Sequence, residues 1–243
     1  MIRTSLFLGV FASLIPACTS PVEDELGEET TADGEDGKGD ATAAFTYYNV
    51  FPDTRACSFD TPDCGGYDVS RANRSLTQCA TLGGASLSKC KVWTIDWSGT
   101  AMPDSVSKSY EQMLHDGTPL LVRGSLVPDP ADRGSVLNAT EIWVPNRSEW
   151  VDGVFTLVKD NGVRCITAPC PSLTERRLNS NLSAQLSTVD LSDSGADADA
   201  IERAMGELYD DGLIVVGYRF YDSAGGKARN ANKFFTRAPV PLR

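Results

Sequence analysis

Cysteine is the residue whose number and spacing point most directly to chemistry in this chain. There are seven. Cys18 stands alone near the N-terminus, and the other six are Cys57, Cys64, Cys79, Cys90, Cys165 and Cys170. No Cys-x-x-Cys occurs, and the spacings differ from those of zinc ribbons, so redox catalysis and metal binding are disfavoured. The sequence therefore predicts disulfides, with no metal and no cofactor.

Two aspartates repeat in a similar setting and could do acid–base or metal chemistry. Asp96 and Asp190 are each followed by an apolar residue and a serine. The favoured alternative is that each carboxylate bonds the backbone of its own turn. Trp93 and Trp97 flank Asp96, and strand alternation would place both on one face, as core or as a ligand platform, with core favoured. These four residues form the candidate ligand face, and no catalytic residue is assigned.

The sequence predicts an export signal at the N-terminus. An apolar run at residues 6–15 follows Arg3 and ends in Ile15-Pro-Ala-Cys18. This run is too short to span a bilayer but fits the core of a signal peptide. The four residues resemble a lipoprotein cleavage box, so we expect a signal peptide at 1–17 and lipid on Cys18. The alternative is an ordinary secretory signal, which would leave Cys18 as an unpaired thiol.

Residues 18–40 are expected to form an acidic, disordered tether. Nine acids and a single base, Lys38, lie between residues 19 and 40, with almost no apolar side chains to bury. This segment supplies most of the net charge of −11. From residue 41 onward the chain carries 20 basic and 24 acidic residues, without a basic stripe. Nucleic acid is therefore an unexpected partner.

The rest of the chain divides into two related halves, residues 41–150 and 151–243. Each half reads as three strands, a helix and two strands, and Asp96 and Asp190 match at an offset of 94. Gly124 and Gly217 interrupt matching apolar strands, as at a bulge or barrel corner. We predict a mainly β fold with one helix per repeat, that is, two tandem β-β-β-α-β-β modules. OB-like barrels are possible, with a mixed α+β sandwich as the alternative.

The first half carries extra residues that hold one cysteine pair. Several connectivities are open, but the duplication favours the local pairs Cys57–Cys64, Cys165–Cys170 and Cys79–Cys90. The last pair would close a hairpin insertion at residues 78–91. We expect this hairpin to add few core contacts, and the Cys165–Cys170 bond to matter more for stability because it would fix a corner between core strands.

Three motifs carry a resemblance to a known family. They are Cys-Gly-Gly-Tyr at 64–67 with Val-Ser-Arg-Ala-Asn-Arg-Ser at 69–75, Ile-Asp-Trp-Ser at 95–98, and Arg-Cys-Ile-Thr-Ala-Pro-Cys-Pro-Ser at 164–172. Together they resemble an uncharacterised domain family of myxobacterial cell-envelope lipoproteins over residues 45–235. The resemblance implies an extracytoplasmic bacterial protein and no particular activity.

The function expected from these observations is a non-enzymatic binding or structural module of the bacterial envelope. A lipid on Cys18 would anchor it to a membrane, with the outer membrane favoured. Its ligand would be an envelope or extracellular protein or a glycan. Two alternatives stay open. One is a proteinase-inhibitor-like protein, because rigid disulfide loops with proline can present a binding segment. The other is an extracytoplasmic hydrolase, for which a Ser-His-Asp set would have to use the single histidine, His115.

Overall fold

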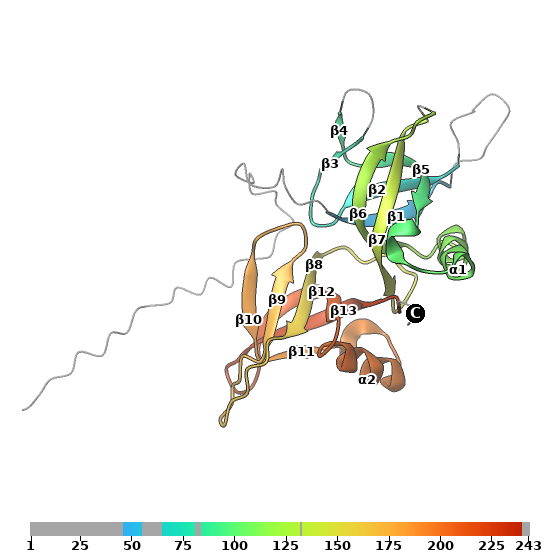
Figure 1. Ribbon diagram of the computed structural model, residues 1–243. Coiled ribbons are helices and arrows are strands. Elements are labelled where there is room, and N and C mark those ends of the chain that lie inside the picture. The colour runs from blue at the N-terminus through green and yellow to red at the C-terminus, as the bar shows by residue number, and fades with distance from the viewer. Residues whose placement is uncertain (1–45, 55–64, 81–83, 132, 240–243) are drawn as a thin grey trace, which may run out of the picture.

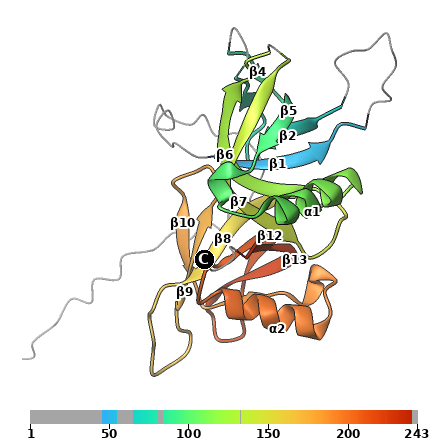
Figure 2. The ribbon, with the colours of Figure 1, turned by 45° about the vertical axis from the view of Figure 1, so that its right-hand side comes forward.

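The computed structural model describes residues 46–54, 65–80, 84–131 and 133–239 (Figure 1). The predicted signal peptide (1–17), the lipid site Cys18, the tether (18–40) and the pair Cys57–Cys64 lie outside these residues. The two sets of strands that follow occupy separate regions of the molecule, each with one helix beside it (Figures 1 and 2).

The strands of the first half close into a five-stranded barrel. Its strands are β1 (Thr46–Pro52), β2 (Tyr67–Arg71), β5 (Cys90–Asp96), β6 (Leu120–Pro128) and β7 (Ser135–Pro145). Pairing runs from β1 to β2, β5, β7 and β6 and returns to β1; only β5 and β7 are parallel. A short hairpin of β3 (Thr77–Gln78) and β4 (Ser86–Leu87) stands apart as its own sheet.

The strands of the second half pair in the same order and also close on themselves, forming the second barrel. Its strands are β8 (Val154–Asp160), β9 (Leu173–Arg177), β10 (Ser183–Leu186), β11 (Thr188–Asp190), β12 (Leu213–Tyr221) and β13 (Lys227–Arg237). Here β10 and β11 share the place of one strand, interrupted at Ser187, and β11 pairs parallel with β13. The end of β13 also pairs with β7, which joins the halves into one eleven-stranded sheet.

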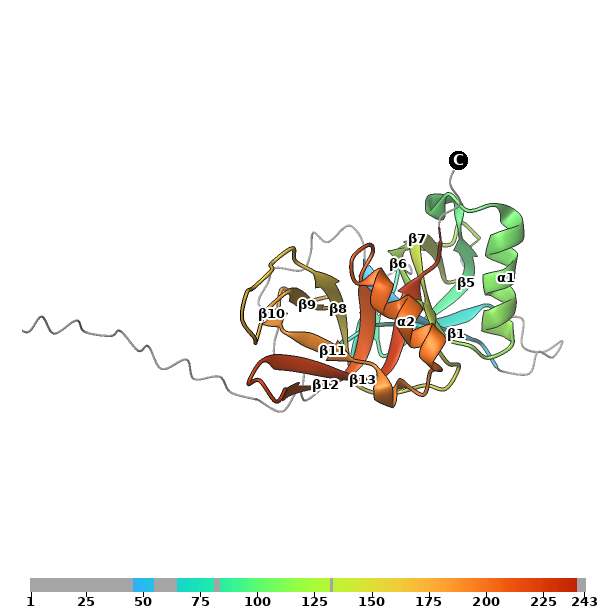
Figure 3. The same ribbon diagram turned by 90° about the horizontal axis from the view of Figure 1, so that it is seen from below.

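Each half has one α-helix, entered through a short 3-10 helix. These elements are η1 (Ser98–Thr100) and α1 (Asp104–His115), then η2 (Ser192–Ser194) and α2 (Ala198–Glu207). Figure 3 shows both helices beside the strands, seen from below. Tyr110 and Leu114 of α1 pack into the first core, and Ala204 of α2 packs into the second. The prediction of a mainly β chain with two α-helices is confirmed for the described residues.

Both predicted strand glycines lie at a bulge. The register shifts between Arg123 and Gly124 in β6 and between Val216 and Gly217 in β12. A Cβ at Gly124 would collide with the carbonyl oxygen of Asn138, and one at Gly217 with that of Asn230. Glycine is therefore required at both places because the neighbouring strand's backbone passes too close for a side chain.

The apolar side chains form three clusters, one in each half and one between them. Along β6, Leu120 and Val122 point into the first core, while Leu121 points into the cluster between the halves. Strand β12 alternates in the same way. Both faces of these strands are therefore buried, which explains their uninterrupted apolar sequence. The buried members of the cluster between the halves are Ala72, Leu121, Trp143, Phe155, Leu178, Ile214, Val216 and Phe235.

The predicted Cys79–Cys90 disulfide is present, but it links the end of β3 to the start of β5, and its place in the fold was wrongly expected. Cys79 and Cys90 are 3% and 0% exposed and belong to the first core, and Cys90 begins β5. The Cys165–Cys170 disulfide is also present, and its loop projects into solvent. The structure therefore favours the opposite ranking of the two bonds from the one expected, because Cys79 and Cys90 lie in the first core while the Cys165–Cys170 loop is exposed.

We expect the paired change Cys79→Ala with Cys90→Ala to lower the free energy of unfolding by about 3 kcal/mol or more. The change frees a loop in the unfolded chain and leaves a cavity in the first core. Cys165→Ala with Cys170→Ala should cost about 2 kcal/mol or less, since its loop is shorter and solvated. Urea denaturation of both variants gives the order, and an equal or opposite order would contradict the role assigned to Cys79–Cys90.

Candidate functional site

Two asparagines hold the halves together at their seam. Asn73 follows β2 and Asn179 follows β9, both with positive φ, 59° and 54°. The Asn73 side chain accepts from the N–H of Phe155 (2.7 Å) and donates to the carbonyls of Phe155 (2.7 Å) and Leu178 (3.0 Å).

Asn179 makes three equivalent bonds from the second half to the first. Its side chain accepts from the N–H of Tyr47 (2.9 Å) and donates to the carbonyls of Tyr47 (2.8 Å) and Ala72 (2.9 Å). Each asparagine thus satisfies backbone groups at the first strand of the other half. Because Asn tolerates the left-handed region and carries both a donor and an acceptor, it suits this position.

A cleft of about 600 Å³ opens along this seam. Its lining includes the apolar side chains Trp143, Leu157 and Leu178, two of which belong to the cluster between the halves. Charged residues from both halves complete the lining. They are the cations Arg123, Lys159, Arg176, Arg177 and Arg237 and the acids Glu141 and Asp211. The cleft therefore joins an apolar surface to an excess of positive charge.

Both acids of the cleft are engaged by arginines at its edge. Glu141 pairs with Arg123 at 2.6 Å and accepts from Trp143 Nε1 at 3.3 Å. Asp211 pairs with Arg237 at 2.7 Å. Among the described residues, no carboxylate forms an ion pair with the three remaining cations, Lys159, Arg176 and Arg177. Three positive charges are therefore available to a ligand.

Tyr47 supplies a neutral hydroxyl in the same cleft. Burial raises the pKa of Tyr47, and the nearby carboxylate of Glu141 raises it further, against the opposing effect of Arg123 and Arg176. The Arg123 guanidinium lies 5.8 Å from the centre of the Tyr47 ring. Tyr47 therefore stays protonated at neutral pH and can donate to an anionic group, with an aromatic face beside it.

The predicted ligand-face residues lie elsewhere. Asp96 accepts from the N–H of Ser98 at 3.0 Å and Asp190 from that of Ser192 at 2.9 Å, so each carboxylate caps its own turn. Trp97 is 9% exposed in the first core and donates to Glu111. Trp93 lies at a register shift of β5, under the guanidinium of Arg133 at 4.7 Å.

The expectation that Trp93 and Trp97 share a face is wrong, because the irregularity between Val92 and Thr94 breaks the alternation of β5. None of Trp93, Asp96, Trp97 and Asp190 lines the cleft. The cleft residues were missed because they come from separate strands in both halves. The adjacent arginines of β9, Arg176 and Arg177, were the signal available in the sequence.

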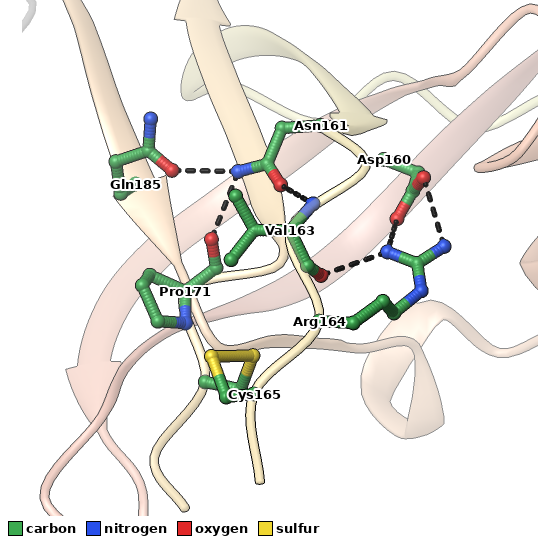
Figure 4. Close-up of a disulfide and its surroundings, with 8 residues drawn as sticks. Asp160, Asn161, Val163, Arg164, Cys165, Pro171 and Gln185 are labelled. Carbon is green, nitrogen blue, oxygen red and sulfur yellow. Dashed lines mark hydrogen bonds and ion pairs between the residues drawn. A yellow bond between two sulfur atoms is a disulfide. The ribbon is translucent and has the colours of Figure 1, made fainter.

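The Cys165–Cys170 loop forms a second exposed feature (Figure 4). At its base, Asn161 Nδ2 donates to the carbonyl of Pro171 at 2.8 Å and to Gln185 at 2.6 Å. Arg164 pairs with Asp160 at 2.9 Å and lowers the pKa of that carboxyl. These bonds and the disulfide constrain the loop, and the side chain of Ile166 within it is fully exposed.

Lys233 in β13 is a buried cation close to the seam. It is 1% exposed, and its Nζ donates to the carbonyl of Glu149 at 2.7 Å. Burial, followed by the charge of Arg147, lowers its pKa from 10.5 to about 8, and Glu149 acts in the opposite direction. The folded protein therefore releases this proton at a lower pH than the unfolded chain does.

This pKa gives a pH dependence of stability. Between pH 8 and 10.5 the unfolded state binds more protons at Lys233, so the free energy of unfolding rises with pH. We expect a rise of about 2 kcal/mol between pH 7.5 and 9.5 that is absent in Lys233→Met. Urea denaturation at several pH values measures it, with the exposed Lys108→Met as the matched control. An equal rise in Lys233→Met would assign the effect to another group.

Two further observations concern metals and membranes. No group of three or more His, Cys, Asp or Glu side chains is placed to hold a metal ion in the parts of the chain that the structure describes. Within the same ranges, no helix has the length and apolar character needed to cross a membrane.

Comparison with known proteins places the chain in a family. No curated protein and no solved structure matches it. Residues 46–239 match a domain of unknown function, DUF6748, and this range contains both barrels and the cleft. At the family level, this confirms the expected relation to an uncharacterised domain. Since the match covers well over half of the chain, the protein belongs to the family of the domain of unknown function DUF6748.

Proposed function

We propose that this protein is a lipid-anchored binding module of the bacterial cell envelope whose seam cleft binds an anionic ligand. The cleft carries the proposal. Lys159, Arg176 and Arg177 line it without acidic partners among the described residues, beside the apolar surface of Trp143 and Leu157. Unpaired cations next to a partly desolvated surface interact more strongly with an anion than cations on an open surface do. The ligand would belong to an envelope or extracellular protein or to a glycan.

Export and anchoring are part of this proposal. The apolar run at residues 6–15 and the sequence Ile15-Pro-Ala-Cys18 support a leader that ends at residue 17 and a lipid on Cys18. The disulfides Cys79–Cys90 and Cys165–Cys170 support an oxidising space outside the cytoplasm. The motifs noted above support an origin among myxobacterial envelope lipoproteins, with the acidic residues 18–40 as the spacer from the outer membrane.

We also propose that the halves, 41–150 and 151–243, are duplicated OB-like modules. Their strands pair in the same order with one parallel pair each, β5–β7 and β11–β13. Both have a bulge glycine at a matching place, and Asn73 and Asn179 make equivalent bonds. The duplication would explain why the seam has a two-fold character, and why a cleft could form between two similar surfaces.

The anchor is tested with Cys18→Ser. The wild-type protein should enter the detergent phase and carry acyl chains, while Cys18→Ser should stay in the aqueous phase without them. Detergent partitioning and intact mass measure the two properties. An unmodified N-terminus on the aqueous wild type would refute the anchor.

The binding proposal is tested by calorimetric titration of the full chain with oligoglutamate. Binding should weaken as salt is added, because ions screen the cleft. Lys159→Glu and Arg176→Glu should each weaken binding by about fivefold or more, since a favourable contact becomes repulsive. Lys108→Glu on α1 makes the same charge change away from the cleft and should leave binding unaltered. Equal losses in all three variants would reject the cleft as the site.

A second candidate function, proteinase inhibition, is favoured by one observation. The loop that carries the fully exposed Ile166 is constrained by the Cys165–Cys170 disulfide and by Asn161 at its base. A constrained loop loses little entropy on binding. Inhibition assays against a panel of secreted proteases would test it, and an inhibitor should lose activity in Ile166→Glu. No inhibition by the wild-type protein across the panel would remove this candidate.

A further inference from the structure

On the proposed duplication, the other pair of strands at the seam carries the counterparts of the cleft residues, and these counterparts are called the second site. Tyr47 lines the cleft, and Phe155 is its counterpart, because each exchanges two backbone bonds with an asparagine of the other half. Four residues further along the same strands lie Phe51 and Lys159. Lys159 lines the cleft, so Phe51 occupies the corresponding place in the second site.

The last strands of the two halves extend this equivalence. Trp143 of β7 and Phe235 of β13 both belong to the cluster between the halves. Glu141 and Lys233 lie two residues before them on these strands. Glu141 pairs with Arg123 on β6, and Lys233 pairs with Val216 on β12. Arg123 and Val216 each directly precede the bulge glycine of their half. Glu141 lines the cleft, and Lys233 is its counterpart in the second site.

The second site is occupied by the linker that joins β7 to β8. The Trp150 ring lies 4.9 Å from that of Phe51 and 5.8 Å from that of Phe155, between centroids. Lys233 donates to the carbonyl of Glu149. The linker therefore contacts the counterparts of Tyr47, Lys159 and Glu141, which all line the cleft. It shows what kind of segment such a surface accepts.

That segment is acidic and aromatic. Glu149 and Asp152 flank Trp150, and the indole Nε1 donates to Asp152 at 2.7 Å. The cleft carries more positive charge than the linker's site, because Lys159 takes the place of Phe51 and Arg123 that of Val216. Arg176 and Arg177 also line the cleft, while Glu141, in the place of Lys233, is paired with Arg123. A segment bound in the cleft should therefore have carboxylates for these cations and an aromatic ring for the Tyr47 and Trp143 surfaces.

We propose that the cleft binds an acidic peptide segment of a partner protein, with one aromatic side chain packed at the seam as Trp150, itself 40% exposed, packs against Phe51 and Phe155 in the second site. This proposal rests on the proposed anion-binding function and specifies its ligand. The cations of the cleft favour acidic residues in the ligand, and Trp150 of the linker indicates that the ligand also has an aromatic residue. The chain's own residues 19–40 are acidic but contain no aromatic residue, so they lack the aromatic side chain that the proposed ligand has.

The probe is a synthetic peptide with the sequence of residues 148–153, Ser-Glu-Trp-Val-Asp-Gly, titrated into the full chain by calorimetry. Replacing its tryptophan by alanine, or both acids by their amides, should weaken binding about tenfold in each case. Arg176→Glu in the protein should weaken binding about tenfold, and Lys108→Glu should not alter it.

The outcomes distinguish this proposal from the anion-binding function on which it rests. If the alanine peptide binds as well as the tryptophan peptide while oligoglutamate binds in the cleft, the aromatic ligand is rejected and the anion-binding function stands. If neither oligoglutamate nor the peptide binds, both proposals fall. If deletion of residues 19–40 raises the peptide affinity more than about tenfold, the chain's own segment is the occupant, and a partner's segment is rejected.

Discussion

Replacing Asn179 with alanine is expected to lower the free energy of unfolding by about 3–5 kcal/mol. The change removes three hydrogen bonds and leaves the N–H of Tyr47 and the C=O of Ala72 without this partner, while the C=O of Tyr47 keeps the bond from the N–H of Ala72 at 3.0 Å. It also forces alanine into a left-handed conformation, since Asn179 has a φ of 54°. The effect should be large for one polar residue because the bonds join the two halves.

Three variants isolate the cause of this loss. Asn179→Gly removes the bonds but tolerates the positive φ, so it should be more stable than the alanine variant by about 1 kcal/mol. Asn73→Ala should cost about as much as Asn179→Ala, because its bonds are equivalent. Asn181→Ala changes an exposed asparagine nearby and should stay within about 0.5 kcal/mol of wild type. Chemical denaturation measures the free energy of unfolding of all four variants. A loss for Asn179→Ala no greater than that for Asn181→Ala would contradict the role of Asn179 in joining the halves.

Local features of the chain could be predicted from its sequence because their causes lie within a few residues. The strand glycines Gly124 and Gly217 stand in short apolar runs, and each lies at a bulge. The turn role of Asp96 and Asp190 depends only on an N–H two residues later. The apolar faces of α1 and α2 follow from helical spacing and pack on the two cores.

Features that depend on distant segments could not be predicted in the same way. Asn73 reads as an ordinary turn residue, yet its partner Phe155 lies 82 residues away. The basic cleft combines Arg123 of β6 with Lys159 of β8 and Arg176 of β9, which a single pass along the chain leaves unrelated. The bulge near Trp93 inverted the expected strand face, because one extra residue moves every later side chain to the opposite side.

The interior of the second barrel holds a set of charges that the first barrel lacks. Glu175 of β9 is 1% exposed and pairs with Arg229, which is 0% exposed, and with Arg219. Arg229 also donates to the carbonyl of Gly217 at 3.0 Å. The proposed duplication matches these three residues to Val69, Leu137 and Leu126 of the first barrel, all in or against its apolar core.

We expect Glu175→Gln to lower the free energy of unfolding by about 3–5 kcal/mol, because it removes the buried carboxylate that pairs with the buried Arg229. The triple variant Glu175→Val, Arg219→Leu and Arg229→Leu copies the first barrel's residues and removes the charges together. It should be neutral or more stable than wild type by about 1–4 kcal/mol, since no desolvated charge remains.

The comparison of these two variants decides what the charges do in the fold. If the single change is severe and the triple change is not, the ion pairs satisfy one another and contribute little net stability. A triple variant as unstable as Glu175→Gln would show that the second barrel cannot be packed with the first barrel's residues. That result would also weaken the proposed equivalence of the halves, because the substitutions rest on matching Glu175 to Val69, Arg229 to Leu137 and Arg219 to Leu126. Chemical denaturation of both variants, with circular dichroism to confirm the native fold, gives the answer.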